Sequence, residues 1–113
     1  MSLNVNIEFK EKDNIWYVVP EGEIDIYTST EFKNILIEKL SEKQADILID
    51  GEKLDYLDST GLGALISILK ITKENDNKIY LENVKSNIRK LFDITDLDKV
   101  FIIKEWKNGK RYY

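Results

Sequence analysis

The chain has 113 residues, 42% of them hydrophobic and 34% charged, and its formal net charge at pH 7 is −4. This length and apolar content fit one folded domain over residues 1–113 and exclude a disordered chain. Histidine and cysteine are both absent, which excludes disulfides, thiolate chemistry and the commonest general base and metal ligand. The acidic balance argues against a nucleic-acid partner, because phosphate contacts need a basic face. No signal peptide or membrane-spanning run is visible, so we expect a cytoplasmic protein without membrane contact.

The first 25 residues predict an antiparallel hairpin. Apolar and polar residues alternate over 3–9, which indicates a half-buried strand. A second strand is predicted over 15–19 and is expected to end at Pro20, because proline cannot donate to a sheet ladder. Gly22 then marks a bulge before the segment that ends at Asp25.

A first helix is predicted to begin at Thr28, because Thr28 and Glu31 have the spacing of a capping box. Apolar residues recur on one face of this helix, at Phe32, Ile35, Leu36 and Leu40. A short apolar strand over 45–50 follows, and residues 54–57 lead into a turn.

The central helix, predicted over 60–74, carries two apolar stripes. One stripe suffices for a helix that lies on a sheet, and it consists of Leu62, Leu65, Ile66 and Leu69. The second stripe consists of Ala64, Ile68 and Ile71. It either contacts neighbouring core or forms an exposed patch for a partner, and for the stripe as a whole we favour the core.

Beyond the central helix the pattern alternates again. The sequence predicts a strand over 78–82, a third helix that starts near Ser86 and a last strand over 100–103. The tail, about residues 107–113, is expected to be frayed, with an Asn-Gly hairpin as the alternative. Strands alternate with helices after the opening hairpin, so the fold class is α/β, with a mixed sheet and helices packed on it.

The clearest chemical signal is Asp58-Ser59-Thr60-Gly61, where a strand runs into the central helix. The first amides of a helix lack intrahelical acceptors, so they and the helix dipole would hold a phosphate placed on a hydroxyl here. Asp and Ser are also ordinary capping residues, and locally that interpretation is the simpler one. Asp25, at the end of a strand, could approach Asp58 and surround the hydroxyl with acid. Phosphorylation would add about −1.5 to −2 charges and disturb a partner surface.

Three other chemistries are less well supported. Gly61-Leu62-Gly63 begins like a dinucleotide fingerprint, but Ile66 stands where the third glycine should be. Asp55 and Asp58 lack the remaining ligands of a hard-metal site, so neither a metal nor a cofactor is expected. Ser59 as a hydrolytic nucleophile has no histidine base and no G-x-S-x-G elbow, so we do not expect an enzyme.

Three segments together resemble the STAS family, and within it the single-domain anti-sigma-factor antagonists of the sporulation and stress-response types. Gly22-Glu23-Ile24-Asp25 is similar to the family's G-E-L-D segment, with Thr28 at the following helix cap. Residues 54–63 are similar to its central L-x-x-[MIL]-D-S-[ST]-G-L-G run. Residues 88–101 resemble its closing pattern, with Asp96 where a glycine is usual. The three segments stand in the family's order and cover most of the chain.

The resemblance implies a mixed sheet with surrounding helices, and it implies a mechanism. The unphosphorylated protein would bind an anti-sigma factor, which is a serine kinase, and so free a sigma factor for transcription. The kinase would phosphorylate Ser59 and end the complex, and a PP2C-type phosphatase would reverse the modification. Thr60 remains open as a competing acceptor.

The resemblance also implies roles for neighbouring residues. The phosphorylation site would be supported by Asp25, Asp58, Thr60 and Gly61. The surface that contacts the partner would include Thr28, Leu62, Gly63 and Ile68. The protein would act as a monomer. The alternative function is a STAS module that binds a transporter or signalling complex as an accessory or scaffold, without being phosphorylated.

Overall fold

The computed structural model describes residues 2–107 and 110–112, with side chains up to residue 104. The strands are β1 (Leu3–Lys10), β2 (Ile15–Ile24), β3 (Asp46–Asp50), β4 (Leu54–Leu57), β5 (Ile79–Glu82), β6 (Ile102–Lys107) and β7 (Lys110–Tyr112). The helices are α1 (Ser29–Glu42), α2 (Ser59–Glu74) and α3 (Ser86–Ile94), and a short 3₁₀ turn covers Leu97–Lys99. The order confirms the predicted opening hairpin followed by alternating helices and strands.

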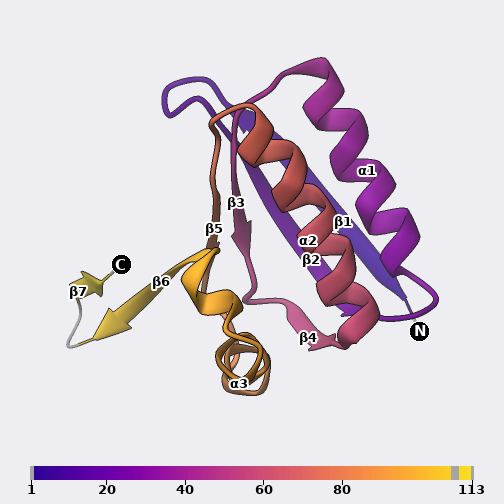
Figure 1. Cartoon of the computed structure of the whole chain (residues 1–113), viewed down its shortest axis with the longest axis vertical. Coiled ribbons are helices and arrows are strands. Elements are labelled where there is room, and N and C mark those ends of the chain that lie inside the picture. Colours follow the sequence, from indigo (N-terminus) through magenta and orange to yellow (C-terminus); the bar gives the residue numbers. More distant parts are fainter. Residues whose placement is uncertain (1, 108–109, 113) are drawn as a thin grey trace.

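The strands form a mixed sheet in the order β1-β2-β3-β5-β6-β7, and β4 pairs with the end of β2. β1 and β2 are antiparallel, whereas β2, β3, β5 and β6 are successive parallel neighbours. Parallel neighbours need crossover connections, which the helices supply. α1 and α2 run side by side across one face of the sheet, and both begin at the end where β4 lies (Figure 1). The predicted α/β fold class is confirmed.

Strand β2 continues to Ile24, so the prediction that it ends at Pro20 is wrong. The first part of β2 pairs with β3 over residues 15–18, and its last part pairs with β4 from residue 22 onward. Pro20 lies between these two stretches, where one edge of β2 has no paired strand and a missing N–H is tolerated. Gly22 has φ +117 and the register shifts after it, which confirms the predicted bulge.

The core lies between the sheet and helices α1 and α2, which also pack on each other. α1 buries Phe32, Leu36 and Leu40, each 1% exposed or less. α2 faces both the sheet and α1, so it buries both predicted stripes, including Leu62, Leu65, Leu69, Ala64 and Ile68. The core interpretation of the second stripe is confirmed. Each fully buried aliphatic or aromatic side chain contributes about 1.5–3 kcal/mol to this packing.

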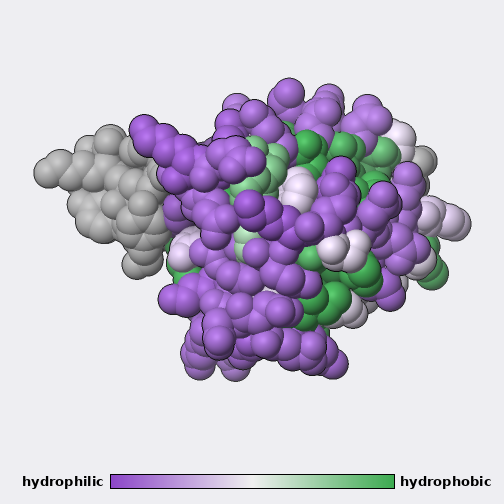
Figure 2. Space-filling model, turned by 90° about the horizontal axis from the view of Figure 1, so that it is seen from above, coloured by the Kyte–Doolittle hydropathy of each residue, from purple (hydrophilic) through white to green (hydrophobic). Residues whose placement is uncertain are grey.

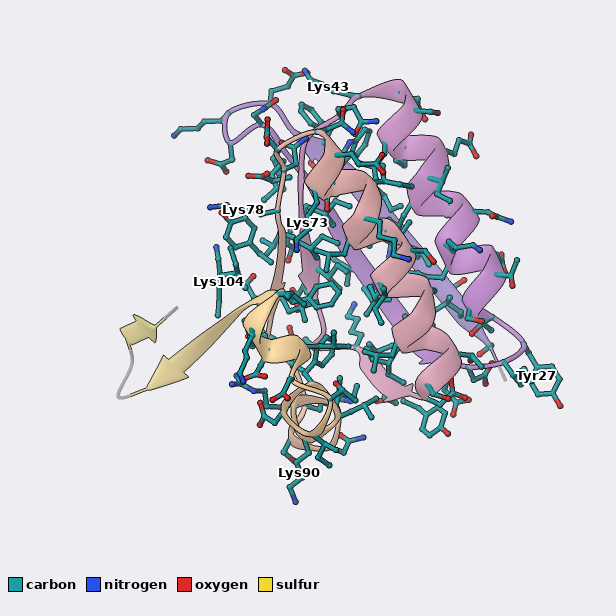
Figure 3. The ribbon with its side chains drawn as sticks, in the orientation of Figure 1. Tyr27, Lys43, Lys73, Lys78, Lys90 and Lys104 are labelled. Carbon is teal, nitrogen blue, oxygen red and sulfur yellow. The ribbon has the colours of Figure 1, made fainter. Side chains whose placement is uncertain are left out.

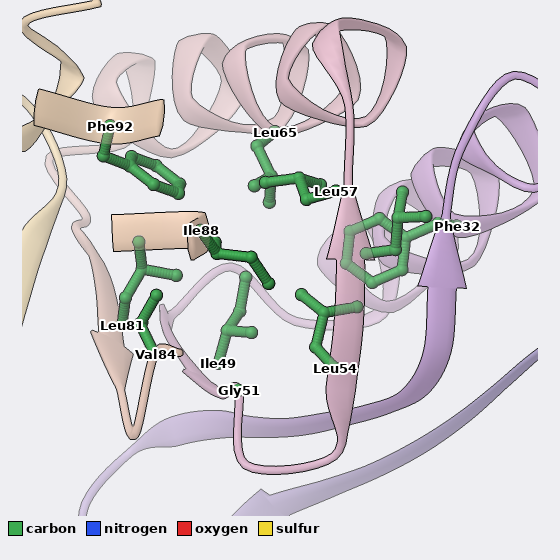
Figure 4. A pocket seen from close by; sticks show the side chains of 11 residues that line it. Phe32, Ile49, Gly51, Leu54, Leu57, Leu65, Leu81, Val84, Ile88 and Phe92 are labelled. Atoms are coloured by element: carbon green, nitrogen blue, oxygen red, sulfur yellow. The ribbon is translucent and has the colours of Figure 1, made fainter. Parts of the chain in front are cut away.

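Helix α3 closes the core at the end where α2 begins. Its buried residues are Ile88 and Phe92, and the rings of Phe92 and Phe101 meet edge to face with centroids 5.4 Å apart. A small space beneath α3 is lined by apolar side chains that include Leu54 and Leu65 (Figure 4). Because its lining side chains are apolar, this space belongs to the packing of α3 and offers no polar chemistry.

In the C-terminal tail, strands β6 and β7 pair with each other. β7 is antiparallel to β6, with Glu105 opposite Tyr112 and Lys107 opposite Lys110. The expectation of a frayed tail is therefore wrong for residues 110–112, because their backbone groups find partners on β6. The Asn108-Gly109 turn that the alternative invoked lies outside the described residues.

A polar cluster joins β2, β3 and the residues after β5. Asp50 Oδ2 accepts a hydrogen bond from the Tyr17 hydroxyl at 2.7 Å, and Oδ1 accepts from the Asn83 side-chain amide at 3.1 Å and the Glu52 N–H at 3.0 Å. Burial acts to raise the pKa of Asp50, but these hydrogen bonds outweigh it and hold the pKa below its usual value. The hydrogen bond to Asp50, and then burial, raise the pKa of Tyr17 to about 12.

We expect this pair to stabilise the fold across neutral pH and to lose its effect at both extremes. The folded pKa of Tyr17 is raised from 10.0, so its contribution is complete below pH 10 and disappears as the pH rises toward about 12. The folded pKa of Asp50 is depressed, so its contribution is present above about pH 4 and is lost as the pH falls further. Tyr17→Phe should lower the free energy of unfolding at neutral pH by about 1–3 kcal/mol.

Urea unfolding over a pH series and an ultraviolet titration of tyrosinate check this expectation. Tyr17→Phe should remove the last tyrosine to ionise. Tyr80→Phe is the matched control, because Tyr80 is half-buried and its hydroxyl makes no hydrogen bond within residues 2–104. A late-ionising tyrosine that persists in Tyr17→Phe would contradict the assignment.

Seen from the end where α1 and α2 finish, the surface is mainly hydrophilic, with some apolar areas between the polar residues (Figure 2). The opposite end, where both helices begin, carries the predicted serine.

Candidate functional site

The turn from β4 into α2 is held by Asp58, the N-cap residue of α2, whose backbone is extended. Its Oδ1 accepts hydrogen bonds from the Thr60 N–H at 2.9 Å, the Gly61 N–H at 3.2 Å and the Thr60 hydroxyl at 2.5 Å. The hydrogen bond from the Thr60 hydroxyl, helped by the two N–H groups, holds the pKa of Asp58 below its usual value. Asp58 is therefore a charged helix cap at neutral pH.

Ser59 is the first residue of α2, and its side chain is exposed. Its hydroxyl forms no hydrogen bond with another residue in the described part of the chain. The hydroxyl of Thr60, in contrast, is half-buried and donates to Asp58. Of the two candidate acceptors, only Ser59 presents a free hydroxyl to a modifying enzyme.

Asp25 organises the turn between β2 and α1. It is 3% exposed, and its Oδ1 accepts from the Tyr27 N–H at 2.9 Å and the Thr28 N–H at 3.2 Å. Its other oxygen, Oδ2, is buried without a hydrogen-bond partner among the described residues. A buried carboxylate oxygen without a partner is costly, so Asp25 is a candidate for a role beyond holding this turn.

The predicted capping box at the start of α1 is wrong. Thr28 is the N-cap residue, but its side chain caps no helical N–H. Its hydroxyl instead donates to the Glu23 carbonyl at 2.8 Å and accepts from the Asp25 N–H at 2.9 Å. The hydroxyl therefore braces the turn that precedes the helix, because that turn brings two unpaired backbone groups within its reach.

The two turns lie next to each other because β4 pairs with β2. Ile24 is opposite Leu57, and the Asp58 N–H donates to the Ile24 carbonyl at 3.4 Å. The structure thus brings Asp25 and Asp58, which follow these strand ends, to one edge of the sheet. Asp55 is not part of this edge cluster, because its carboxylate forms an ion pair with Lys85.

Gly61 is required by the close approach of α2 to β2. A Cβ at this position would lie 2.5 Å from Leu57 Cδ1, 2.8 Å from Ile24 Cγ2 and 2.8 Å from the Ile24 carbonyl oxygen. A Cβ at Gly63 would meet nothing within 4 Å. Gly61 therefore supports the site by allowing the turn to close, whereas Gly63 leaves open space on the surface of α2.

We expect Gly61→Ala and Gly63→Ala to change the free energy of unfolding in opposite directions. Gly61→Ala should lower the free energy of unfolding by about 1–3 kcal/mol, because the methyl group has no room. Gly63→Ala should raise it by about 0.5–1 kcal/mol, because alanine favours the helix and the space is open. Urea unfolding of both variants measures the difference, and the same sign for both would contradict the packing described.

Three of the four residues predicted to contact a partner are buried. Thr28 is 6% exposed, Leu62 6% and Ile68 0%. Leu62 and Ile68 belong to the buried core, so the prediction that their side chains contact a partner directly is wrong. Thr28 is buried within the turn that its hydroxyl braces. Gly63 is half-buried and remains accessible.

Three exposed apolar side chains near the two turns were not predicted from the sequence. Ile26 is 67% exposed, Tyr27 80% and Tyr56 42%. Tyr27 projects away from the body at the end where α1 and α2 begin (Figure 3). The sequence does indicate that Ile26 and Tyr27 are exposed, because they stand between a strand end and a helix cap, where an apolar pair has no core to enter.

Among the described residues, no group of three Asp, Glu, His or Cys side chains is arranged to hold a metal ion. In the same part of the chain, no helix has the length and apolar character needed to cross a bilayer.

Comparison with known proteins identifies the family. A model of the STAS domain matches residues 6–108. The anti-sigma-B factor antagonist of Staphylococcus aureus (strain NCTC 8325 / PS 47) is 35% identical over 103 residues, which cover 91% of this chain and 95% of that protein. An anti-sigma factor antagonist from Mycobacterium paratuberculosis matches with a TM-score of 0.75 at 23% identity, over 90% of this chain and 85% of that one.

The Bacillus cell fate determinant SpoIIAA, in its phosphorylated form, matches with a TM-score of 0.68 at 17% identity, over 88% of this chain and 90% of that one. At these sequence identities the solved structures show only the fold. The family model and the staphylococcal relative show the family, because each matches nearly the whole sequence. This chain belongs to the STAS domain family.

Proposed function

We propose that this chain is an anti-sigma-factor antagonist that is switched off by phosphorylation of Ser59. The observation that carries the proposal is the exposed, unbonded Ser59 hydroxyl at the first residue of α2, in a chain whose staphylococcal relative is named an anti-sigma-B factor antagonist. In this proposal the protein is not an enzyme and supplies only the acceptor hydroxyl.

The geometry around Ser59 favours a change of charge without a change of fold. Asp58 already caps α2, so the helix does not need a phosphate in order to form. A phosphate on the first residue lies at the positive end of the helix dipole, which tolerates it. The modification then adds about −1.5 to −2 charges to the surface beside Asp58. A partner that binds the neutral surface would meet this charge directly.

The exposed side chains beside Ser59 supply the apolar contact that a protein partner needs. Ile26 and Tyr27 extend from a turn that is held rigid by the hydrogen bonds of Asp25 and Thr28. Tyrosine on a rigid turn is a favourable anchor, because it buries a large area and loses little conformational entropy. We propose that these two residues and Gly63 belong to the surface that contacts the partner.

The partners in this proposal are an anti-sigma factor that is a serine kinase and a PP2C-type phosphatase that regenerates the serine. The protein acts as a cytoplasmic monomer without a metal or cofactor and binds neither nucleic acid nor a membrane. Asp25, Asp58, Thr60 and Gly61 support the site by fixing the two turns around Ser59.

Incubation with the serine kinase encoded next to its gene tests the function. The intact mass should increase by one phosphate with ATP, and Ser59→Ala should abolish the increase whereas Thr60→Ser should not. The unmodified protein should bind the kinase, and the phosphorylated protein should not. Binding to a transporter subunit without any phosphate gain would support the accessory-module alternative instead.

A further inference from the structure

A polar groove runs between the first turns of α1 and α2, beside the proposed phosphorylation site. Its lining residues are neutral or basic: Ser29, Thr30 and Lys33 from α1, and Thr60, Gly63, Ala64 and Ser67 from α2. The two helices lie side by side and begin at the same end of the molecule (Figure 1). The positive ends of both helix dipoles therefore lie at this groove.

Donors at the start of α1 are unused. Because the Thr28 side chain caps no amide, the N–H groups of Thr30 and Glu31 find no acceptor in the described part of the chain. The first turn of α2 differs, since Asp58 already accepts from the Thr60 and Gly61 N–H groups. The N–H donors of the groove that have no acceptor are thus on its α1 side.

Ser29 provides an independent observation at the same place. It is only 8% exposed and lines the groove, yet its hydroxyl has no hydrogen-bond partner among the described residues. The hydroxyl oxygen itself is not enclosed by protein atoms, so a ligand in the groove can reach it and supply an acceptor.

Lys33 supplies a positive charge one helical turn from Ser29. Its side chain is half-buried and forms no ion pair within residues 2–104. No carboxylate lines the groove to neutralise it. Gly63 leaves space opposite, since a Cβ there would meet nothing within 4 Å.

We propose that this groove binds a single phosphate group, with the Ser29 hydroxyl and the first amides of α1 as donors and the Lys33 ammonium group as counter-charge. Two sources have this chemistry. One is free inorganic phosphate. The other is the phosphoryl group of Ser59, which lies four residues from Gly63 on the same helix face, and this second source rests on the proposed function.

Titration of the full chain with inorganic phosphate, at constant ionic strength, tests the groove by amide NMR. Saturable shifts should appear at Ser29, Thr30 and Gly63. Lys33→Gln and Ser29→Ala should each weaken binding roughly tenfold or more, because each removes a charge-assisted or buried hydrogen bond. Lys70→Gln is the control, since Lys70 is exposed on α2, does not line the groove and carries the same charge.

The same titration on protein phosphorylated at Ser59 separates the two sources. If the phosphoryl group fills the groove, added phosphate should no longer bind, and Lys33→Gln should raise the second pKa of the phosphoserine from near 6. If free phosphate still binds, the groove serves a free anion. Shifts that never saturate, or equal affinities in Lys33→Gln and Lys70→Gln, would overturn the proposal. The inorganic phosphate result stands whether or not a kinase modifies Ser59.

Discussion

Ser59→Asp should weaken binding to the anti-sigma factor by about 2–5 kcal/mol, which corresponds to a loss of affinity of about 30-fold or more. The side chain is exposed in the free protein, and it lies at the end of the molecule where α1 and α2 begin and where Tyr27, part of the surface proposed for the partner, projects outward. A carboxylate placed there must be desolvated when the partner binds, and Asp58 nearby already repels it. Isothermal titration of the purified partner with each variant measures the loss.

Two control variants test whether the loss comes from the charge at position 59. One controls for the size of the new side chain, and the other controls for the change in the protein's net charge. Ser59→Asn has nearly the shape of Ser59→Asp but no charge, so it should retain most of the affinity. Ser41→Asp adds the same charge at the far end of α1, where Ser41 is exposed, and should change the affinity little. Equal affinities for wild type and Ser59→Asp would refute a switch that acts through charge. A loss in Ser41→Asp equal to that in Ser59→Asp would show a general electrostatic effect instead.

Ile68→Ala should lower the free energy of unfolding by about 2–5 kcal/mol. Ile68 is 0% exposed and lies in the core beneath α2, so the substitution leaves a cavity that its neighbours fill only in part. A domain of this size has a total stability of about 5–15 kcal/mol, so the loss is a large fraction of the whole. Urea unfolding measures it.

The partner affinity of folded Ile68→Ala should equal that of wild type, because the side chain does not reach the surface. Lys70→Ala, two positions further along α2 and exposed, should change the stability by less than about 0.5 kcal/mol. If Ile68→Ala weakened partner binding without reducing stability, Ile68 would be an interface residue and the core described for α2 would be incorrect.

The elements could be predicted from the sequence because their signals are local. The alternation over β1, the apolar face of α1 and the Asp58 cap each depend on residues only a few positions apart. The serine at the start of α2 was found for the same reason, since a strand, a cap and a helix follow each other directly. The local pattern alone indicates an ordinary helix cap, and it is the family resemblance that makes Ser59 a candidate phosphorylation site.

Several features depended on partners distant in the sequence. Pro20 stands inside β2 because β3 pairs before it and β4 pairs after it. Ile68 is core because α1 packs against the second face of α2. No local pattern carries this information.

The chain's own sequence determined that Ser59 begins a helix and that no histidine or cysteine stands near it. Only the tertiary structure decided which neighbours share its surface. Pairing of β4 with β2 places the turn of Asp25, Ile26 and Tyr27 beside α2, and the packing of α1 on α2 places Ser29 and Lys33 across a groove from Gly63. The physical reason is that burial and contact between segments 30 residues apart or more are set by how the sheet is ordered, and that order is a property of the whole chain.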